Sequence, residues 1–189
     1  MNKAIFLDRD GTINVEKNYL YKIKDFKFLP GVIDALKQLQ QAGYLLIIIT
    51  NQSGIGRGYY TEEDFRELNT WMLSILKEKG VSITDVYYCP HLPNAQVPEY
   101  RKNCDCRKPK LGMYEQAIFD YDIDLNNSYA IGDKIRDCAI CNTTSCQGFL
   151  IGENESFEMR RAVNEGVFKR VRYAKNLAEA ASWICQETR

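Results

Sequence analysis

The chain has 189 residues, of which 45% are hydrophobic and 26% charged, and its formal net charge is zero. This length suits one compact domain with its own core, and the composition is that of a soluble globular protein. A balanced charge argues against a nucleic-acid binder, which needs a broad positive field, and the chain has no apolar run long enough to cross a membrane.

Short apolar runs alternate with amphipathic runs along the chain. We predict strands at 4–7 and 44–49 and weaker ones at 86–88, 128–131 and 148–151. We predict helices at 31–41, 61–79, 111–120, 135–142 and 177–186, the second with Thr61 as its N-cap. This alternation predicts an α/β fold, a doubly wound, Rossmann-like parallel sheet with helices on both faces. We expect residues 1–189 to form a single domain.

The N-terminus meets charged residues before a signal-peptide apolar region can develop. The chain has seven cysteines, an odd number that does not favour a disulfide framework. Reduced thiols and a cytoplasmic location are therefore expected.

Small polar and acidic residues follow three of the predicted strands. Asp8 and Asp10 follow the first, Thr50 follows the second, and Asp133 follows a later one. Because parallel sheets bind ligands at the carboxyl ends of their strands, these residues are expected to share one site.

The carboxylates of this site favour Mg²⁺. Asp8 and Asp10 fall on the same side of an extended segment, where they repel each other unless a cation or a shared proton intervenes. Asp133 and Asp137 are spaced i, i+4 and can face the same site. Hard carboxylate oxygens with few other ligands suit Mg²⁺ together with a substrate phosphate.

The same residues can transfer a phosphoryl group. Asp8 can attack phosphorus, while Thr50 and Lys108 hold the equatorial oxygens. Asp10 can protonate the departing oxygen and later deprotonate the water that breaks the acyl phosphate.

Four motifs resemble those of the haloacid dehalogenase superfamily phosphatases, in the same order. They are Asp8-Arg9-Asp10-Gly11-Thr12, Thr50 after an isoleucine run, Lys108-Pro109 and Gly132-Asp133-Lys134-x-x-Asp137, and together they span residues 4–137. The resemblance implies Asp8 as nucleophile, Asp10 as general acid and base, and Thr50 and Lys108 as phosphoryl stabilisers. It also implies Mg²⁺ on Asp8, Asp133 and the backbone carbonyl of Asp10. Asp137 is expected not to bind the metal directly but to cap or orient Lys134.

A second group of residues has the chemistry of a zinc site. Cys89, His91, Cys104 and Cys106 bracket a loop, 89–106, with little periodicity. Three thiolates and one imidazole suit a closed, tetrahedral, structural Zn²⁺ site, which would order the loop and the residues Arg107 and Lys108 after it. Cys138 and Cys141 are expected instead to pack in the core.

Longer stretches resemble the D,D-heptose 1,7-bisphosphate phosphatases, a family within the histidinol-phosphatase-like subgroup. These are Phe6–Asn14, Thr50–Ile55, Tyr87–His91 and Cys104–Pro109. The resemblance implies removal of the 7-phosphate of D-glycero-D-manno-heptose 1,7-bisphosphate, a sugar phosphate on the route to nucleotide-activated heptose for surface polysaccharide. It also implies a monomer. It assigns sugar contacts to Glu16, Lys17, Asn18, Tyr19, Asn51, Gln52 and Ser53, the retained phosphate to Arg107, and the transferred phosphate to Lys134.

Substrate recognition should depend on short loops. Only 37 residues separate Thr12 from Thr50, and the stretch from Asn51 to Arg107 is filled by a helix, a strand and the cysteine loop. A large cap domain does not fit, so the site should be open.

Other functions compete with this reading. Histidinol-phosphate phosphatases share the motifs and the metal loop, but the twelve residues between His91 and Cys104 favour the heptose enzymes. A DNA 3′-phosphatase is disfavoured by the neutral charge. The non-enzymatic alternatives are a phospho-receiver, which has no obvious use for Asp10, and a zinc-built interaction module. A mutase usually needs a cap. The anomer preference, α or β, stays open.

Overall fold

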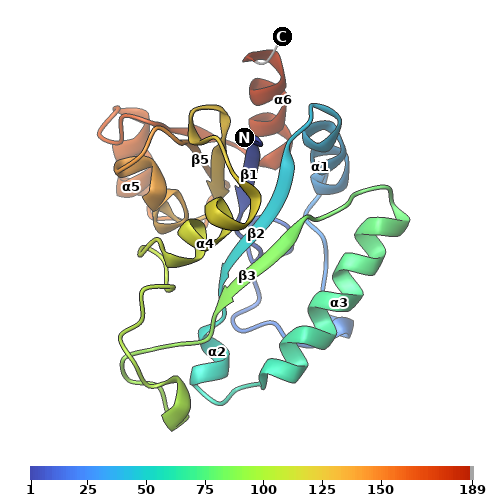
Figure 1. The fold of residues 1–189 in the computed structure, drawn as a ribbon, viewed down its shortest axis with the longest axis vertical. Coiled ribbons are helices and arrows are strands. Elements are labelled where there is room, and N and C mark those ends of the chain that lie inside the picture. Colours follow the sequence, from blue (N-terminus) through green and yellow to red (C-terminus); the bar gives the residue numbers. More distant parts are fainter. Residues whose placement is uncertain (188–189) are drawn as a thin grey trace.

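The computed structural model describes residues 1–187, which contain a six-stranded parallel sheet (Figure 1). Its strands are β1 (Ala4–Leu7), β2 (Leu45–Asn51), β3 (Asp85–Cys89), β4 (Tyr129–Gly132), β5 (Gln147–Ile151) and β6 (Val171–Ala174). Their order is β3-β2-β1-β4-β5-β6. The chain winds outward in both directions from β1, so the strand order reverses between β1 and β4, and a binding crevice is expected there.

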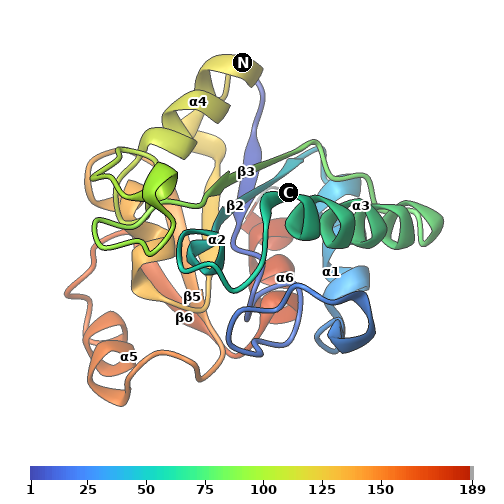
Figure 2. The same ribbon diagram turned by 90° about the horizontal axis from the view of Figure 1, so that it is seen from below.

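Helices cover both faces of the sheet (Figure 2). One face carries α1 (Val32–Gln41), α3 (Glu62–Glu78) and α6 (Leu177–Glu187), and the other carries α4 (Gly112–Tyr121), α5 (Phe157–Asn164) and the 3₁₀ helix η4 (Ile135–Asn142). Ile5 and Leu7 of β1 pack into the first layer, whereas Ala4 and Phe6 pack into the second. This alternation along β1 explains why the strand is apolar throughout. The predicted doubly wound α/β fold is confirmed.

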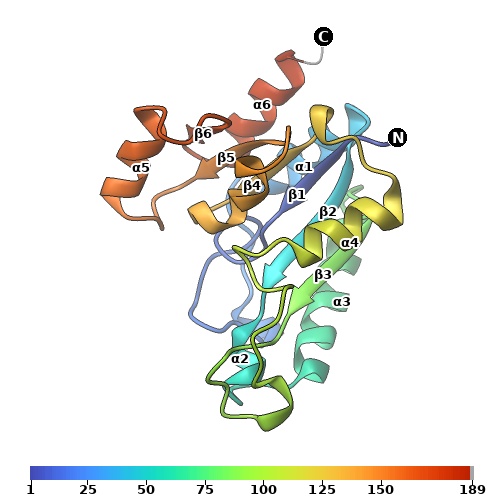
Figure 3. The same cartoon turned by 60° about the vertical axis from the view of Figure 1, so that its left-hand side comes forward.

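The loops at the carboxyl end of the sheet are long but contain very little secondary structure (Figure 3). The segments 8–31 and 90–111 contain only single turns of 3₁₀ helix, Ile23–Asp25 and Pro98–Tyr100. The short helix α2 (Ser53–Gly56) follows β2 directly. The site therefore has no large cap domain within residues 1–187, as predicted. None of the helices in that range is both long and apolar enough to span a membrane.

The predicted N-terminus of α3 is confirmed. The backbone N–H of Asp64 donates to Thr61 Oγ1 at 3.1 Å, and the Thr61 N–H donates to Asp64 Oδ2 at 2.7 Å. This reciprocal pair satisfies two of the donors that a helix start leaves open.

Other predicted elements were inaccurate. Residues 135–142 wind as a 3₁₀ helix, although a run of this length is uncommon and nothing in the sequence signals it. Strand β6 and helix α5 were not predicted: β6 is four residues long and includes Arg172, and α5 is short, with half of its residues polar. Cys138 and Cys141 pack in the core as expected.

Candidate active site

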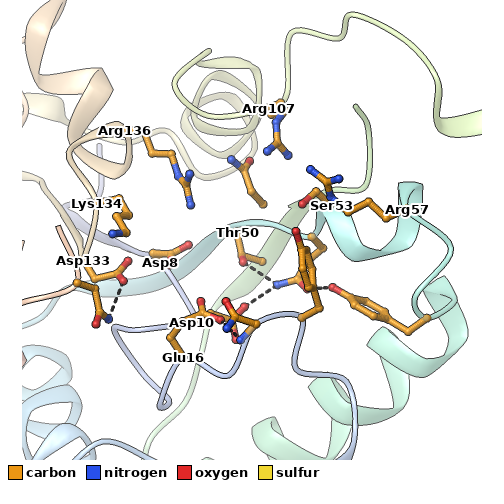
Figure 4. A pocket seen from close by; sticks show the side chains of 16 residues that line it. Asp8, Asp10, Glu16, Thr50, Ser53, Arg57, Arg107, Asp133, Lys134 and Arg136 are labelled. Atoms are coloured by element: carbon orange, nitrogen blue, oxygen red, sulfur yellow. Dashed lines mark hydrogen bonds between the residues drawn. The ribbon is translucent and has the colours of Figure 1, made fainter. Parts of the chain in front are cut away.

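The carboxyl end of the sheet carries a cavity of about 490 Å³ (Figure 4). Its wall is built from residues that follow β1, β2 and β4 and from the loop after Cys106. The predicted site residues that line it are Asp8, Asp10, Glu16, Asn18, Tyr19, Thr50, Asn51, Gln52, Ser53, Arg107, Asp133 and Lys134. The topology therefore brings the predicted strand-end residues together, except that Thr50 lies inside β2 and does not follow it.

Lys108 lies beneath the cavity and holds Asp8. Its Nζ donates to Asp8 Oδ1 at 2.7 Å, to the Ile49 carbonyl at 2.6 Å, and forms an ion pair with Asp137 Oδ1 at 2.8 Å. These three partners match the three N–H donors of an ammonium group. Burial alone would lower the pKa of Lys108, but the charges of Asp137 and Asp8 outweigh burial and raise it. Lys108 is thus a buried cation that fixes the orientation of Asp8.

The carboxylates outnumber that cation. Ligand atoms of Asp8, Asp133 and Asp137 lie within 4.8 Å of one another. Burial raises the pKa of Asp8 well above its ordinary value; Lys108 opposes this, and the neighbouring carboxylates add to it. Burial and the charge of Asp137 raise the pKa of Asp133 to about 6. A divalent cation would relieve this crowding, and the hard oxygen donors fit Mg²⁺.

Asp137 has both oxygens engaged within the protein. Oδ1 pairs with Lys108, and Oδ2 accepts the backbone N–H of Lys134 at 3.0 Å. The position agrees with the prediction that Asp137 caps the turn at Lys134. Asp133 remains directed toward the cavity, and Asn154 Nδ2 donates to its Oδ2 at 2.9 Å.

Gly11 allows the loop after β1 to approach Asp133. Its φ is +85°, and a Cβ at this position would lie 2.2 Å from Asp133 Oδ2. A side chain there would collide with the carboxylate and strain the backbone. The glycine in the Asp-x-Asp-Gly motif is therefore required by a close approach.

Asp10 is held by three side chains. Arg9 Nη2 donates to both of its oxygens at 2.9 Å, Asn14 Nδ2 donates to Oδ1 at 2.9 Å, and Gln52 Nε2 donates to Oδ2 at 2.9 Å. Arg9 and Asn14 are fully buried. The plane of the Asp10 carboxylate is consequently fixed before substrate arrives.

Some predicted sugar contacts have other partners. Asn51 forms two hydrogen bonds with the backbone of Lys108, at 3.0 and 3.1 Å. Gln52 is 2% exposed and bonds within the site. Lys17 is exposed and does not line the cavity, whereas its neighbours Glu16 and Asn18 do. This position does not support the predicted contact of Lys17.

The zinc loop has its four predicted ligands in one cluster. The ligand atoms of Cys89, His91, Cys104 and Cys106 lie within 4.8 Å of one another. Cys89 Sγ is 3.5 Å from Cys104 Sγ, and His91 Nδ1 is 3.2 Å from Cys106 Sγ. Hydrogen bonding with Cys89 lowers the pKa of Cys106 to about 5, despite partial burial. Three sulfurs and one imidazole nitrogen around a common point fit tetrahedral Zn²⁺.

We expect Cys106→Ser to lose bound zinc. The wild-type protein should retain about one zinc ion per chain after dialysis against a weak chelator, and the variant close to none, because one thiolate of the closed site is missing. Elemental analysis measures this directly. The control is Cys185→Ser, which lies outside the cluster. Equal zinc in the two variants would contradict the assignment.

Four cavity residues were not predicted: Arg57, Tyr60, Arg136 and Asn154. Arg57 follows α2, and Arg136 occupies one of the variable positions between Lys134 and Asp137. The sequence pointed to both arginines: Arg136 lies within the Gly132–Asp137 motif, and Arg57 lies two residues after the Thr50–Ile55 stretch. Asn154 falls in a segment without a readable pattern.

The comparisons with known proteins agree with this geometry. A family model described as polynucleotide kinase 3 phosphatase matches residues 3–145. A D-glycero-beta-D-manno-heptose-1,7-bisphosphate 7-phosphatase of Haemophilus ducreyi is 53% identical over 142 residues, 75% of this chain and 78% of that protein. A D-glycero-alpha-D-manno-heptose-1,7-bisphosphate 7-phosphatase of Photorhabdus laumondii is 53% identical over 135 residues, 71% and 74% of the two chains.

Solved structures extend the similarity to nearly the whole chain. The D,D-heptose 1,7-bisphosphate phosphatase from B. bronchiseptica, complexed with magnesium and phosphate, has a TM-score of 0.82 at 30% identity and covers 98% of this chain and 99% of that one. The fold and its strand-end carboxylates define a phosphatase of the haloacid dehalogenase type. Within that class, the chain belongs to the family of heptose-1,7-bisphosphate 7-phosphatases.

Proposed function

We propose that this chain removes the 7-phosphate of D-glycero-D-manno-heptose 1,7-bisphosphate through a phosphorylated Asp8. The product would serve the synthesis of nucleotide-activated heptose for surface polysaccharide. The relatives named above support the substrate, and the buried Asp8–Lys108 pair supports the nucleophile.

In the first half of the reaction, an Asp8 oxygen attacks phosphorus as the bond to the sugar oxygen breaks. Lys108 orients Asp8 through Oδ1, and Thr50 offers its hydroxyl to the phosphoryl oxygens. Asp10 gives its proton to the departing sugar oxygen. Lys134 lines the cavity and offers a positive charge to the transferred phosphate.

In the second half, water attacks the acyl phosphate and Asp10 accepts its proton, which restores both aspartates. Mg²⁺ would be held by Asp8, Asp133 and the backbone carbonyl of Asp10. When bound, it neutralises the repulsion between the carboxylates and the phosphate.

Three arginines give the strongest support for a bisphosphate. Arg57, Arg107 and Arg136 line the cavity, and none forms an ion pair with a carboxylate among residues 1–187. Arg57 Nε and Arg107 Nη1 are buried without a hydrogen-bond partner. Burial lowers the pKa of Arg107, and the charges of Arg136 and Arg57 lower it further. The labelled arginines project toward the cavity from three different segments (Figure 4).

This arrangement separates two kinds of charge. Asp8, Asp10 and Asp133 occupy the side of the cavity proposed for the metal and the transferred phosphate. Arg57 and Arg107 lie across the cavity, and Arg136 lies near Lys134 (Figure 4). Guanidinium groups without carboxylate partners suit a second phosphate, which they can bind bidentately. The ammonium group of histidinol phosphate would be repelled there.

A substrate panel tests the proposal. With Mg²⁺ present, we expect kcat/KM for the α- or β-heptose bisphosphate to exceed that for histidinol phosphate by about 100-fold, because only the bisphosphate pairs with the arginines. Phosphate release measures both. Equal or greater turnover of histidinol phosphate would refute the heptose assignment.

A DNA 3′-phosphatase is the second candidate, because the matching family model carries that description. The chain has zero formal net charge, which gives a long polyanion little attraction. The panel therefore includes a 3′-phosphorylated oligonucleotide, for which we expect no turnover above that of a simple alkyl phosphate.

We further propose that residues 1–189 form one domain that acts as a monomer in the cytoplasm. All seven cysteines lie within residues 1–187 and none forms a disulfide, which supports a reducing compartment. Both layers of helices pack on the same sheet, which supports one domain.

A further inference from the structure

The orientation of Asp10 depends on an amide whose own orientation is fixed by a tyrosine. Gln52 Nε2 donates to Asp10 Oδ2 and to Thr50 Oγ1, both at 2.9 Å, and Tyr60 Oη donates to Gln52 Oε1 at 2.6 Å. The bonds that reach Thr50 and Asp10 are drawn in Figure 4. A side-chain amide has two N–H donors, and both are used here.

The alternative amide orientation is unfavourable. It would place the carbonyl oxygen of Gln52 against the carboxylate of Asp10, so that two acceptors faced each other. The amide nitrogen must therefore face Asp10, and the carbonyl must face Tyr60. A tyrosine hydroxyl is a donor that satisfies this carbonyl, whereas a phenylalanine ring would leave a buried acceptor unpaired.

The Tyr60 ring is held firmly. It is 6% exposed and stacks on the Tyr21 ring, with centroids 5.3 Å apart and an angle of 12° between the planes. Gly54 leaves room for it, since a Cβ there would lie 2.1 Å from Tyr60 Cε1. The ring also belongs to a small apolar cluster with Ile55 and Phe65. A rigid ring delivers its hydroxyl to one place, as preorganisation requires.

We infer that Tyr60 is a positioning residue that acts through Gln52 on the general acid Asp10. The inference rests on the proposed function, because it takes the acid role of Asp10 as given. In the step concerned, the Asp8–phosphorus bond forms, the bond from phosphorus to the sugar oxygen breaks, and the proton on Asp10 passes to that oxygen. Tyr60 lines the cavity, but its hydroxyl donates to Gln52, so its proposed effect on Asp10 passes through that amide.

The test compares two leaving groups in wild type and Tyr60→Phe. A sugar oxygen needs the proton of Asp10 to depart, whereas p-nitrophenolate leaves without one. The parameter is kcat/KM, which reports only the steps up to loss of the leaving group and excludes the later attack of water. We expect Tyr60→Phe to lower kcat/KM for the heptose bisphosphate about 10-fold and for p-nitrophenyl phosphate less than about 3-fold.

Two further variants exclude a general structural effect. Tyr59→Phe removes the hydroxyl of the neighbouring, 52% exposed tyrosine and should leave both substrates unchanged. In a Gln52→Leu background, Tyr60→Phe should cause no additional loss, because the hydroxyl has lost the group through which it acts. Equal losses on both substrates, no loss on either, or additive losses in the Gln52→Leu background would each overturn the inference.

Failure of the proposed function gives a different result. If Asp10→Asn lowered kcat/KM equally for the two leaving groups, the acid role of Asp10 would be wrong, whatever Tyr60→Phe did. If Asp10→Asn selectively impaired the sugar substrate and Tyr60→Phe did not, the proposed function would stand and the role of Tyr60 would be rejected.

Discussion

Asp8→Asn should reduce phosphate release by about 10⁴-fold or more, since the loss of a catalytic nucleophile typically has effects of this order or larger. An amide of the same shape is a poor nucleophile toward phosphorus and cannot form the acyl phosphate. The variant should still fold, because it keeps the size of the side chain and removes one of three crowded carboxylates. Steady-state phosphate release with the heptose bisphosphate is the measurement.

The covalent intermediate can be sought directly. Acid quenching of wild type during turnover of a substrate labelled in the 7-phosphate should leave label on the protein, and Asp8→Asn should leave none. Asp34→Asn, an exposed carboxylate on α1, serves as the matched control and should behave as wild type. Full activity of Asp8→Asn would contradict the proposed mechanism.

Lys108→Met should damage both stability and turnover. The Lys108 side chain is 1% exposed and pairs with Asp8 and Asp137, so its removal leaves the buried Asp137 and the partly buried Asp8 without a cation. Breaking a buried pair on one side typically costs about 3–5 kcal/mol of unfolding free energy. Loss of the group that orients the nucleophile should also lower kcat by about 10²-fold or more. Denaturant unfolding without Mg²⁺ and phosphate release are the two measurements.

The neighbouring Lys110→Met is the control for Lys108. Lys110 is 43% exposed, and its ion pair with Asp105 and its hydrogen bonds to Asn103 and the Cys104 carbonyl all lie at the surface, where such contacts contribute little. Addition of Asp137→Asn to Lys108→Met should restore part of the lost stability, because it removes one of the two unpaired charges. A Lys108→Met protein as stable as Lys110→Met would show that the buried pair does not stabilise the fold.

Much of this protein was predictable from local sequence patterns. A buried parallel strand is apolar throughout, so 4–7 was recognised with the bounds of β1, and β2 was recognised to within two residues at its carboxyl end. The Thr61 cap of α3 was readable because its partners lie within three residues. Strand β6 and helix α5 were missed, since short elements with exposed charged residues carry little apolar periodicity.

The grouping of the proposed catalytic residues in one cavity was also predictable, because the motifs follow the strands of a parallel sheet. Asp8 and Lys108 are 100 residues apart in the chain, yet the motif order placed them in one site, and the structure joins them at 2.7 Å. The hydrogen bonds of Gln52 and Tyr60 were not predictable in this way. Gln52 was expected to contact the sugar, whereas the structure directs it to Asp10 and Thr50.

The sequence alone determined the class of fold, the two metal-type clusters and the residues at the carboxyl ends of the strands. Each of these depends on residue type and spacing within a short segment. Only the tertiary structure decided which groups pair. Lys108 pairs with Asp137 and Tyr60 with Gln52, whereas Arg57, Arg107 and Arg136 have no carboxylate partner within residues 1–187. Such pairings depend on distances of a few ångströms between segments remote in the chain, because hydrogen bonds and buried ion pairs are lost over small displacements that leave the hydrophobic pattern unchanged.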